Sequence, residues 1–209
     1  MSLWTLVPVK PLNRGKSRLS SVLSEDDRTL LNYKLLFNTL QSLSGVPEVH
    51  RVLVVSRDPT ILSLAREFGF QTLQEDDDAS DLNTALKRAS VVAQMYGATA
   101  LLVLPADLPL LNPLTIQAML KKAGDTPGMV IAPDRHMQGT NAIWISPPDL
   151  IEFRFGQGSF ARHLEQAKEM GVPCVVVEQP ALELDLDLPD DLSMLEKIDP
   201  SYAILRTHS

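Results

Sequence analysis

A three-layer α/β/α sandwich around a mostly parallel sheet is the fold class that this sequence predicts. Short apolar runs of strand length alternate with stretches in which apolar residues recur every three or four positions, as on one face of a helix. Runs such as Leu101–Leu104 are apolar throughout instead of at every second residue, which is typical of parallel strands that helices cover on both sides. We therefore expect an α/β protein.

The expected strands and helices alternate along the chain. Strands are predicted at Leu3–Val9, Arg51–Ser56, Thr99–Leu104, Met129–Ala132, Ala142–Ile145 and Pro173–Val177. Helices are predicted at residues 26–44, 60–68, 81–96, 113–123, 159–170 and 190–197.

Two of these helices begin with recognisable signals. Ser24 is followed three residues later by Asp27, which is typical of a capped start, and Asn112 precedes Pro113 at the first helical position. No internal repeat and no linker rich in Pro, Gly or Ser divides the sequence. We expect one domain over residues 1–209, a length that is ample for a core.

The composition narrows the functional classes. The chain has 19 Lys and Arg against 26 Asp and Glu, a formal charge of −7, which does not favour broad binding of nucleic acid. A single cysteine, Cys174, excludes an internal disulfide and favours a cytoplasmic location. The apolar run Leu3–Val9 precedes the nearby cations, the opposite order to a signal peptide, and no run is long enough to span a bilayer. We expect no membrane partner.

Four cations stand within nine residues directly after the first expected strand: Lys10, Arg14, Lys16 and Arg18. Because ligands of open α/β sheets bind at the carboxyl ends of the strands, these cations indicate a polyphosphate site. Gly15 would let the backbone approach a phosphate, whereas Arg14 is expected to point to solvent. The alternative is a solvated loop. The segment is not a P-loop, because Lys10 stands where that motif needs its first glycine.

Acidic residues follow two other segments. Asp107 comes directly after an apolar strand, where a lone charge is costly unless it is paired or binds a metal. Asp185 and Asp187 lie on one face of a strand-like segment, and with Asp107 they could bind Mg²⁺. The alternative is an acidic edge strand. We expect Asp190 and Asp191 only to open the following helix.

A glycine-rich segment, Gly156–Ser159, precedes another expected helix. Its amides and the Ser159 hydroxyl could bind an anion at the helix N-terminus. A purely structural turn and helix cap would account for the same residues. His163, further along, could face a bound carboxylate or lie on the helix surface.

Five motifs together indicate a family. The segments PVKPLNRGKSRL, LPADLPLL, APDRHMQGTNAIWI, FGQGSFARHL and DLDLPDDL resemble the guanylyltransferases of coenzyme F-420 biosynthesis, in the same order and over most of the chain. That family joins GTP to 2-phospho-L-lactate, phosphoenolpyruvate or 3-phosphoglycerate. The resemblance implies a Rossmann-like fold of the nucleotide-diphospho-sugar-transferase type.

The resemblance also implies roles for individual residues. The metal ligands, for Mg²⁺, are Asp107, Asp185 and Asp187. The nucleotide-binding residues are Lys10, Gly15 and Asn83, and the residues with catalytic roles are Asp107, Lys16 and Arg18. The residues that hold the phospho-acid are Thr140, Gly156 and Ser159. Asp81 is a departure, because the family usually has a glycine there.

The expected reaction is transfer of GMP from GTP to a small phosphorylated carboxylic acid, with release of pyrophosphate. The acceptor phosphate is already ionised near neutral pH, so positioning and charge neutralisation suffice without a general base. Phosphoenolpyruvate is favoured as the acceptor, and a homodimer is one expected assembly. The alternatives are another nucleotidyltransferase of the same fold, acting on the molybdenum cofactor or a sugar phosphate, and an inactive nucleotide-binding module.

Overall fold

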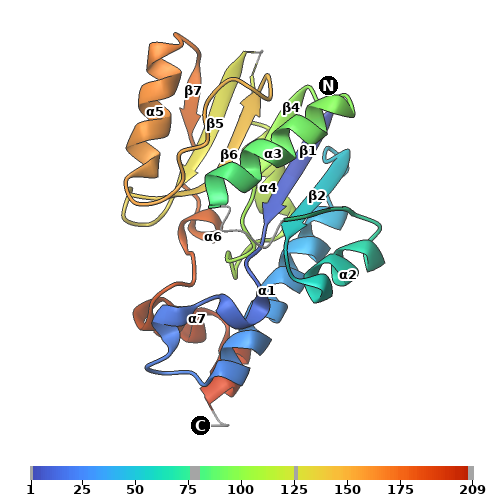
Figure 1. Ribbon diagram of the computed structural model, residues 1–209. Coiled ribbons are helices and arrows are strands. Elements are labelled where there is room, and N and C mark those ends of the chain that lie inside the picture. Colours follow the sequence, from blue (N-terminus) through green and yellow to red (C-terminus); the bar gives the residue numbers. More distant parts are fainter. Residues whose placement is uncertain (1, 76–80, 125–126, 207–209) are drawn as a thin grey trace.

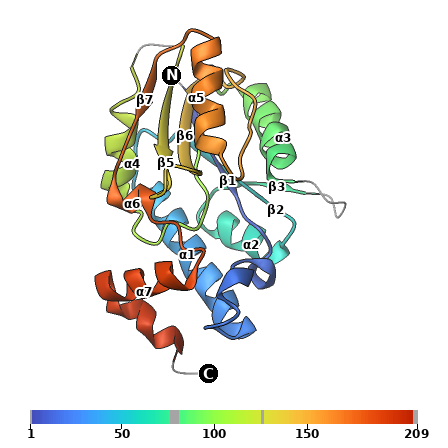
Figure 2. The ribbon, with the colours of Figure 1, turned by 90° about the vertical axis from the view of Figure 1, so that its left-hand side faces the viewer.

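The three-layer α/β/α fold is confirmed by a computed structural model, which describes residues 2–75, 81–124 and 127–206 (Figures 1 and 2). The strands are β1 (Leu3–Pro8), β2 (Arg51–Ser56), β3 (Gln71–Gln74), β4 (Ala100–Val103), β5 (Gly128–Pro133), β6 (Thr140–Ser146) and β7 (Cys174–Val176). Within these residues they form one sheet in the order β3-β2-β1-β4-β6-β5-β7. Only β6 is antiparallel to its neighbours, which confirms a mostly parallel sheet.

Helices cover both faces of the sheet. They are α1 (Glu25–Ser44), α2 (Pro59–Glu67), α3 (Leu82–Met95), α4 (Pro113–Leu120), α5 (Ser159–Glu169), α6 (Pro180–Glu183) and α7 (Pro189–Ile198), with 3₁₀ turns η1 (Leu12–Arg14), η2 (Ser17–Leu19) and η3 (Pro200–Arg206). Side chains of α1, α2 and α4 pack on one face, and those of α3 and α5 pack on the other. Strand β1 shows why: Leu3 and Val7 face the first group, whereas Trp4 and Leu6 face the second.

A third group of buried side chains lies beyond the carboxyl ends of the strands, where the first and last parts of the chain lie side by side (Figures 1 and 2). We call it the end core: Leu19, Leu23, Leu31, Leu35, Leu184, Leu186, Leu192, Leu195 and Tyr202. It joins η2, the start of α1, the connection between α6 and α7, and α7 itself. The end core therefore brings segments from both ends of the chain together.

All of the predicted strands and helices are present, with ends that differ from the predicted bounds by at most three residues. The two predicted helix starts are confirmed: the Asp27 amide donates to Ser24 Oγ at 3.1 Å, and the Thr115 amide donates to Asn112 Oδ1 at 3.0 Å. Sequence analysis missed β3 and the short helix α6. Strand β3 is a partly exposed edge strand whose sequence, QTLQ, holds a single large apolar residue, so its hydrophobic pattern is weak.

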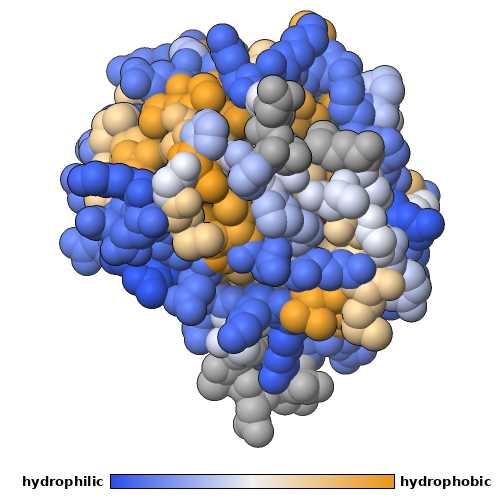
Figure 3. Space-filling view, turned by 90° about the horizontal axis from the view of Figure 1, so that it is seen from above, coloured by the Kyte–Doolittle hydropathy of each residue, from blue (hydrophilic) through white to orange (hydrophobic). Residues whose placement is uncertain are grey.

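The far end of the sheet, opposite the end core, presents a mainly hydrophilic surface with hydrophobic residues gathered between polar ones (Figure 3). No feature of this surface identifies a second copy of the chain as its partner. The expected homodimer therefore stays a prediction. Among the helices of the described ranges, none combines the length and the apolarity that crossing a membrane requires.

Shortening a side chain in the end core should destabilise the protein. Leu35→Ala leaves a cavity at a position that is 0% exposed, so the free energy of unfolding should fall by about 2–5 kcal/mol. Leu30→Ala in the same helix shortens a side chain that is 56% exposed, and should change that free energy by less than about 0.5 kcal/mol. Urea unfolding followed by circular dichroism measures both. Similar losses in the two variants would contradict this packing.

Candidate active site

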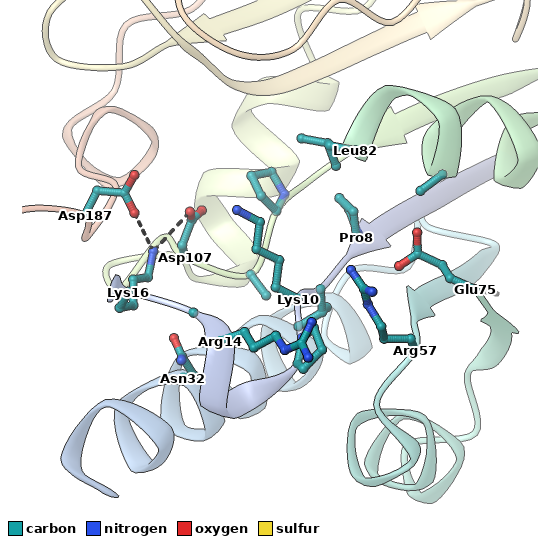
Figure 4. Close-up of a pocket in the computed structure, with 16 residues that line it drawn as sticks. Pro8, Lys10, Arg14, Lys16, Asn32, Arg57, Glu75, Leu82, Asp107 and Asp187 are labelled. Carbon is teal, nitrogen blue, oxygen red and sulfur yellow. Dashed lines mark hydrogen bonds and ion pairs between the residues drawn. The ribbon is translucent and has the colours of Figure 1, made fainter. Parts of the chain in front are cut away.

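A cavity of about 340 Å³ lies at the carboxyl ends of β1 and β4 (Figure 4). In the sheet, β2 lies on one side of β1 and β4 lies on the other. Open α/β sheets bind ligands where the strand order switches in this way. Its lining residues come from the segment after β1, the segment after β4, the ends of β2 and β3, the start of α3 and the connection before α7: Pro8, Val9, Lys10, Pro11, Arg14, Gly15, Lys16, Asn32, Arg57, Glu75, Leu82, Ala85, Pro105, Ala106, Asp107 and Asp187. The predicted cationic loop and two of the predicted acids therefore share one cavity.

Lys16 lies between the two carboxylates that line this cavity, those of Asp107 and Asp187. Its Nζ donates to Asp107 Oδ2 at 3.2 Å and to Asp187 Oδ1 at 2.9 Å, and its side chain is only 7% exposed (Figure 4). Burial alone would lower the pKa of Lys16, but the charges and hydrogen bonds of the two carboxylates outweigh it and raise that pKa. Burial opposes ionisation of Asp187 as well, yet the Lys16 ammonium keeps the pKa of Asp187 below its ordinary value. The three groups form one charged unit.

Asp185 lies close to this unit without an ammonium partner of its own. Burial and the charges of Asp107 and Asp187 raise the pKa of Asp185 to about 6. Asn141 Nδ2 donates to Asp185 Oδ1 at 3.4 Å. The three predicted metal ligands therefore gather at one edge of the sheet.

No group of three or more His, Cys, Asp or Glu side chains in the described part of the chain is arranged to hold a metal ion. The Lys16 ammonium lies between two of the carboxylates instead. The donor set still has the chemistry that Mg²⁺ prefers, since all three groups supply carboxylate oxygens. The metal site stays a prediction.

The segment that carries Asp185 and Asp187 is an extended connection between α6 and α7, so the alternative of an acidic edge strand is wrong. Its alternation is real, because Leu184 and Leu186 are buried in the end core while the two aspartates are partly exposed. The Leu186 amide donates to the Asp107 carbonyl at 3.1 Å, which ties the two acidic segments together.

Asp191 holds the same connection from its other end. Its Oδ2 accepts from the backbone amides of Asp187 at 3.0 Å and Leu188 at 2.6 Å, so the predicted helix-opening role of Asp191 is confirmed. Its Oδ1 forms an ion pair with Arg135 Nη2 at 2.6 Å, and Asp191 is only 3% exposed. Sequence analysis missed this pair, because residues 135 and 191 are far apart in the chain and no local pattern links them.

The remaining cations differ in their relation to the cavity. Lys10, Arg14 and Arg57 line it, and Figure 4 shows their side chains directed into it. Arg14 is exposed, as expected, but it also lines the cavity, because the 3₁₀ turn η1 places it on the cavity wall. Arg18 is not a lining residue: its side chain is 71% exposed and its Nη1 lies 4.0 Å from Asp187 Oδ2.

Gly15 is required by a close approach that sequence alone did not reveal. A Cβ at this position would lie 2.5 Å from Asn32 Nδ2. That nitrogen donates to the Leu12 carbonyl at 2.6 Å and so fixes the cationic loop on α1. The glycine therefore has a packing role besides the predicted contact with phosphate.

Asn83, a predicted nucleotide ligand, bonds to the backbone of Phe155, directly before the glycine-rich segment. Its Oδ1 accepts from the Phe155 amide at 2.7 Å, and its Nδ2 donates to the Phe155 carbonyl at 3.3 Å. Asp81, two residues earlier, caps α3 by accepting from the amides of Asn83 and Thr84 at 2.8 and 3.2 Å. The departure from the family's glycine thus serves the start of the helix.

The predicted phospho-acid residues lie around the start of α5. Gly156 and Gly158 have φ values of 115° and 72°, which side-chain-bearing residues rarely adopt. The Ser159 hydroxyl that follows them is buried and has no hydrogen-bond partner among the described residues. Thr140 Oγ1 bonds to His163 Nδ1 at 3.0 Å, and His163 is fully buried, so the predicted helix-surface histidine is wrong.

Comparison with known proteins agrees with this geometry. The family described as "Guanylyl transferase CofC like" matches residues 3–197. A phosphoenolpyruvate guanylyltransferase from Rubrobacter xylanophilus is 44% identical over 196 residues, 94% of each chain. A 2-phospho-L-lactate guanylyltransferase from Methanocaldococcus infernus is 33% identical over 189 residues, 90% of this chain and 82% of the relative.

Solved structures support the fold. A protein described as a nucleotide-diphospho-sugar transferase from Desulfovibrio desulfuricans G20 superposes with a TM-score of 0.76 at 18% identity, over 98% of this chain and 94% of that one. The likeness confirms the predicted nucleotide-diphospho-sugar-transferase-like architecture. Since the family match spans most of the sequence and the relatives align along nearly all of it, the chain belongs to the family of CofC-like guanylyl transferases.

Proposed function

We propose that this protein transfers GMP from GTP to phosphoenolpyruvate, with release of pyrophosphate, in the biosynthesis of coenzyme F-420. The observation that carries the proposal is one cavity in which cations of the loop after β1 face carboxylates that follow β4 and precede α7. The relative that is 44% identical and named phosphoenolpyruvate guanylyltransferase supports this choice of acceptor. 2-phospho-L-lactate is the second candidate, because the 33% identical relative is named for it.

The cavity accounts for binding of a nucleoside triphosphate. Lys10, Arg14 and Lys16 all line the cavity, so each can meet a phosphate of the nucleotide. An ammonium group has three N–H donors, and Lys16 directs only two of them to carboxylates. Its third N–H can therefore bind a phosphate oxygen.

The carboxylates account for a divalent cation, for which we propose Mg²⁺. Asp107 and Asp187 lie within reach of one cation, as their shared contact with the Lys16 ammonium demonstrates, and Asp185 is close enough to feel both charges. A bound Mg²⁺ would neutralise negative charge on the reacting phosphates. Lys16 supplies positive charge at the same place, and the connection held by Asp191 orients the ligands.

The residues proposed to bind the acceptor are Thr140, Gly156 and Ser159. Ser159 Oγ at the start of α5 is buried and has no hydrogen-bond partner among the described residues, and backbone amides there favour an anion. Its neighbour one helical turn later, His163, bonds to Thr140 at the start of β6. We assign the binding of the phosphorylated acid to the hydroxyls of residues 140 and 159, which lie outside the lining of the cavity. The acceptor phosphate is itself the nucleophile, so no general base is needed.

Removing one charge from the carboxylate cluster should abolish most of the activity. Asp107→Asn keeps the size of the side chain but weakens the site for cations, so turnover should fall by roughly a hundredfold or more. Pyrophosphate release with GTP, Mg²⁺ and phosphoenolpyruvate measures it, and circular dichroism checks that the fold persists. Asp190→Asn is the matched control, because Asp190 is exposed and lies in the first turn of α7. Near-normal turnover in Asp107→Asn would sink the assignment.

The cations of the loop should contribute unequally to GTP binding. Arg14→Ala should raise the KM for GTP about tenfold, because its guanidinium lines the cavity and can bond to a charged phosphate. Arg18→Ala should raise it less than about twofold, since that side chain is 71% exposed outside the cavity wall. Steady-state kinetics at saturating phosphoenolpyruvate compares the two. A larger effect at Arg18 than at Arg14 would contradict this prediction and support the catalytic role that the resemblance implies for Arg18.

The acceptor can be identified from the product. Incubation with GTP, Mg²⁺ and phosphoenolpyruvate should form a guanosine diphosphate ester and pyrophosphate, and mass spectrometry detects both. 2-phospho-L-lactate carries its phosphate on the same carbon but is not planar there, which is worth about 1–3 kcal/mol of discrimination in a tight pocket. Product from 3-phosphoglycerate alone would overturn the order of acceptors. No product from any of the three acids would refute the proposed class of reaction.

A further inference from the structure

His163 is a buried, ordered group to which the proposed reaction gives no role. It lies in α5 four residues after Ser159, and it is 0% exposed. Its Nδ1 is 3.0 Å from Thr140 Oγ1, and its Nε2 is 3.1 Å from the backbone nitrogen of Arg154. The ring of Phe155 packs edge-on against it, with the centroids 5.1 Å apart. Contacts on three sides fix the orientation of the imidazole.

The backbone contact determines where the imidazole carries its proton. An amide N–H can only donate, so Nε2 must accept from Arg154 and has no proton of its own. Burial, followed by the positive charges of Arg162 and Arg154, lowers the pKa of His163 to about 4, so the ring is neutral near pH 7. A neutral ring without a proton on Nε2 carries it on Nδ1. His163 Nδ1 therefore donates to Thr140 Oγ1.

This direction determines what the Thr140 hydroxyl can offer. A hydroxyl has one proton and two lone pairs, and His163 occupies a lone pair. Among the described residues, His163 is the one side chain that bonds to this hydroxyl. The hydroxyl proton is therefore left to donate to something else. Ser159 Oγ, one turn before His163 on the same helix, is buried, has no partner in the described part of the chain and can donate as well.

We infer that His163 is a positioning residue that holds the Thr140 hydroxyl as a hydrogen-bond donor toward the anionic acceptor. Two hydroxyl donors suit an acceptor whose carboxylate and phosphate only accept hydrogen bonds, and they disfavour a ligand that presents donors of its own. The identity of this acceptor rests on the proposed function, whereas the proton position rests on the contacts of the ring alone.

Two substitutions at position 163 separate this role from packing. Glutamine places its amide at the Nε2 end of the imidazole, where it can still accept from Arg154, but it loses the donor to Thr140. Asparagine places its amide at the Nδ1 end, where it can still donate to Thr140, but it loses the contact with Arg154. The two variants are therefore matched controls for each other.

His163→Gln should raise the KM for phosphoenolpyruvate about tenfold and leave the KM for GTP unchanged, the effect of losing one hydrogen bond to a charged ligand. His163→Asn should keep the KM for phosphoenolpyruvate within about twofold of the wild type. The double variant Thr140→Val/His163→Gln should be no worse than Thr140→Val alone, because without the Thr140 hydroxyl the donor of His163 has nothing left to position. Equal effects of glutamine and asparagine, or equal changes in both KM values, would overturn the inference.

The proton position can be measured without any activity. In the ¹⁵N NMR spectrum of the wild-type protein near pH 7, the His163 ring should show a protonated Nδ1 and an unprotonated Nε2. A protonated Nε2 would overturn the inference even in an active enzyme. If the wild-type protein transfers no GMP to any of the phospho-acids, the proposed function fails, and the NMR result still decides the role assigned to the ring.

Discussion

The bonds from the buried Lys16 ammonium to Asp107 and Asp187 are the interaction on which the geometry of the site depends. A charge with a 7% exposed side chain is costly unless opposite charges and hydrogen bonds surround it. Its two partners follow β4 and precede α7, so this requirement draws three distant parts of the chain to one point. The left-handed backbone of Lys16, with φ of 56°, is the local strain that this placement maintains.

The end core makes that placement stable. Leu19 lies three residues after Lys16 and belongs to the same core cluster as Leu184 and Leu186. These two leucines flank Asp185. The same apolar contacts that bury the leucines therefore leave both aspartates partly exposed, with Asp187 lining the cavity. The ion pair of Arg135 with Asp191 then fixes the far end of the connection. Hydrophobic packing sets the coarse position of the carboxylates, and hydrogen bonds set their orientation.

Much of this arrangement could be predicted from the sequence, and the failures have a common cause. Asp107 follows an apolar strand, and the cations follow another, so the rule that ligands lie at the carboxyl ends of strands was sufficient to bring them together. The contacts of Asn83 and Arg135 could not be predicted, because the partners of both residues lie far away in the chain. Those contacts depend on how the layers pack. Strand β3 was missed because an edge strand with one large apolar residue has almost no periodic signal.

The reversed direction of β6 brings the two halves of the site to the same edge of the sheet. Because β6 is antiparallel to β4 and β5, Thr140 at its start lies beside the carboxyl ends of the parallel strands. Asn141, the next residue, donates to the carbonyl of Leu182 at 2.9 Å and to Asp185 at 3.4 Å, while Thr140 bonds to His163. Neighbouring residues of one strand thus contact both the carboxylate cluster and His163. This shared strand keeps the cavity and the start of α5 in a fixed relation, as the proposed in-line transfer between two substrates would require.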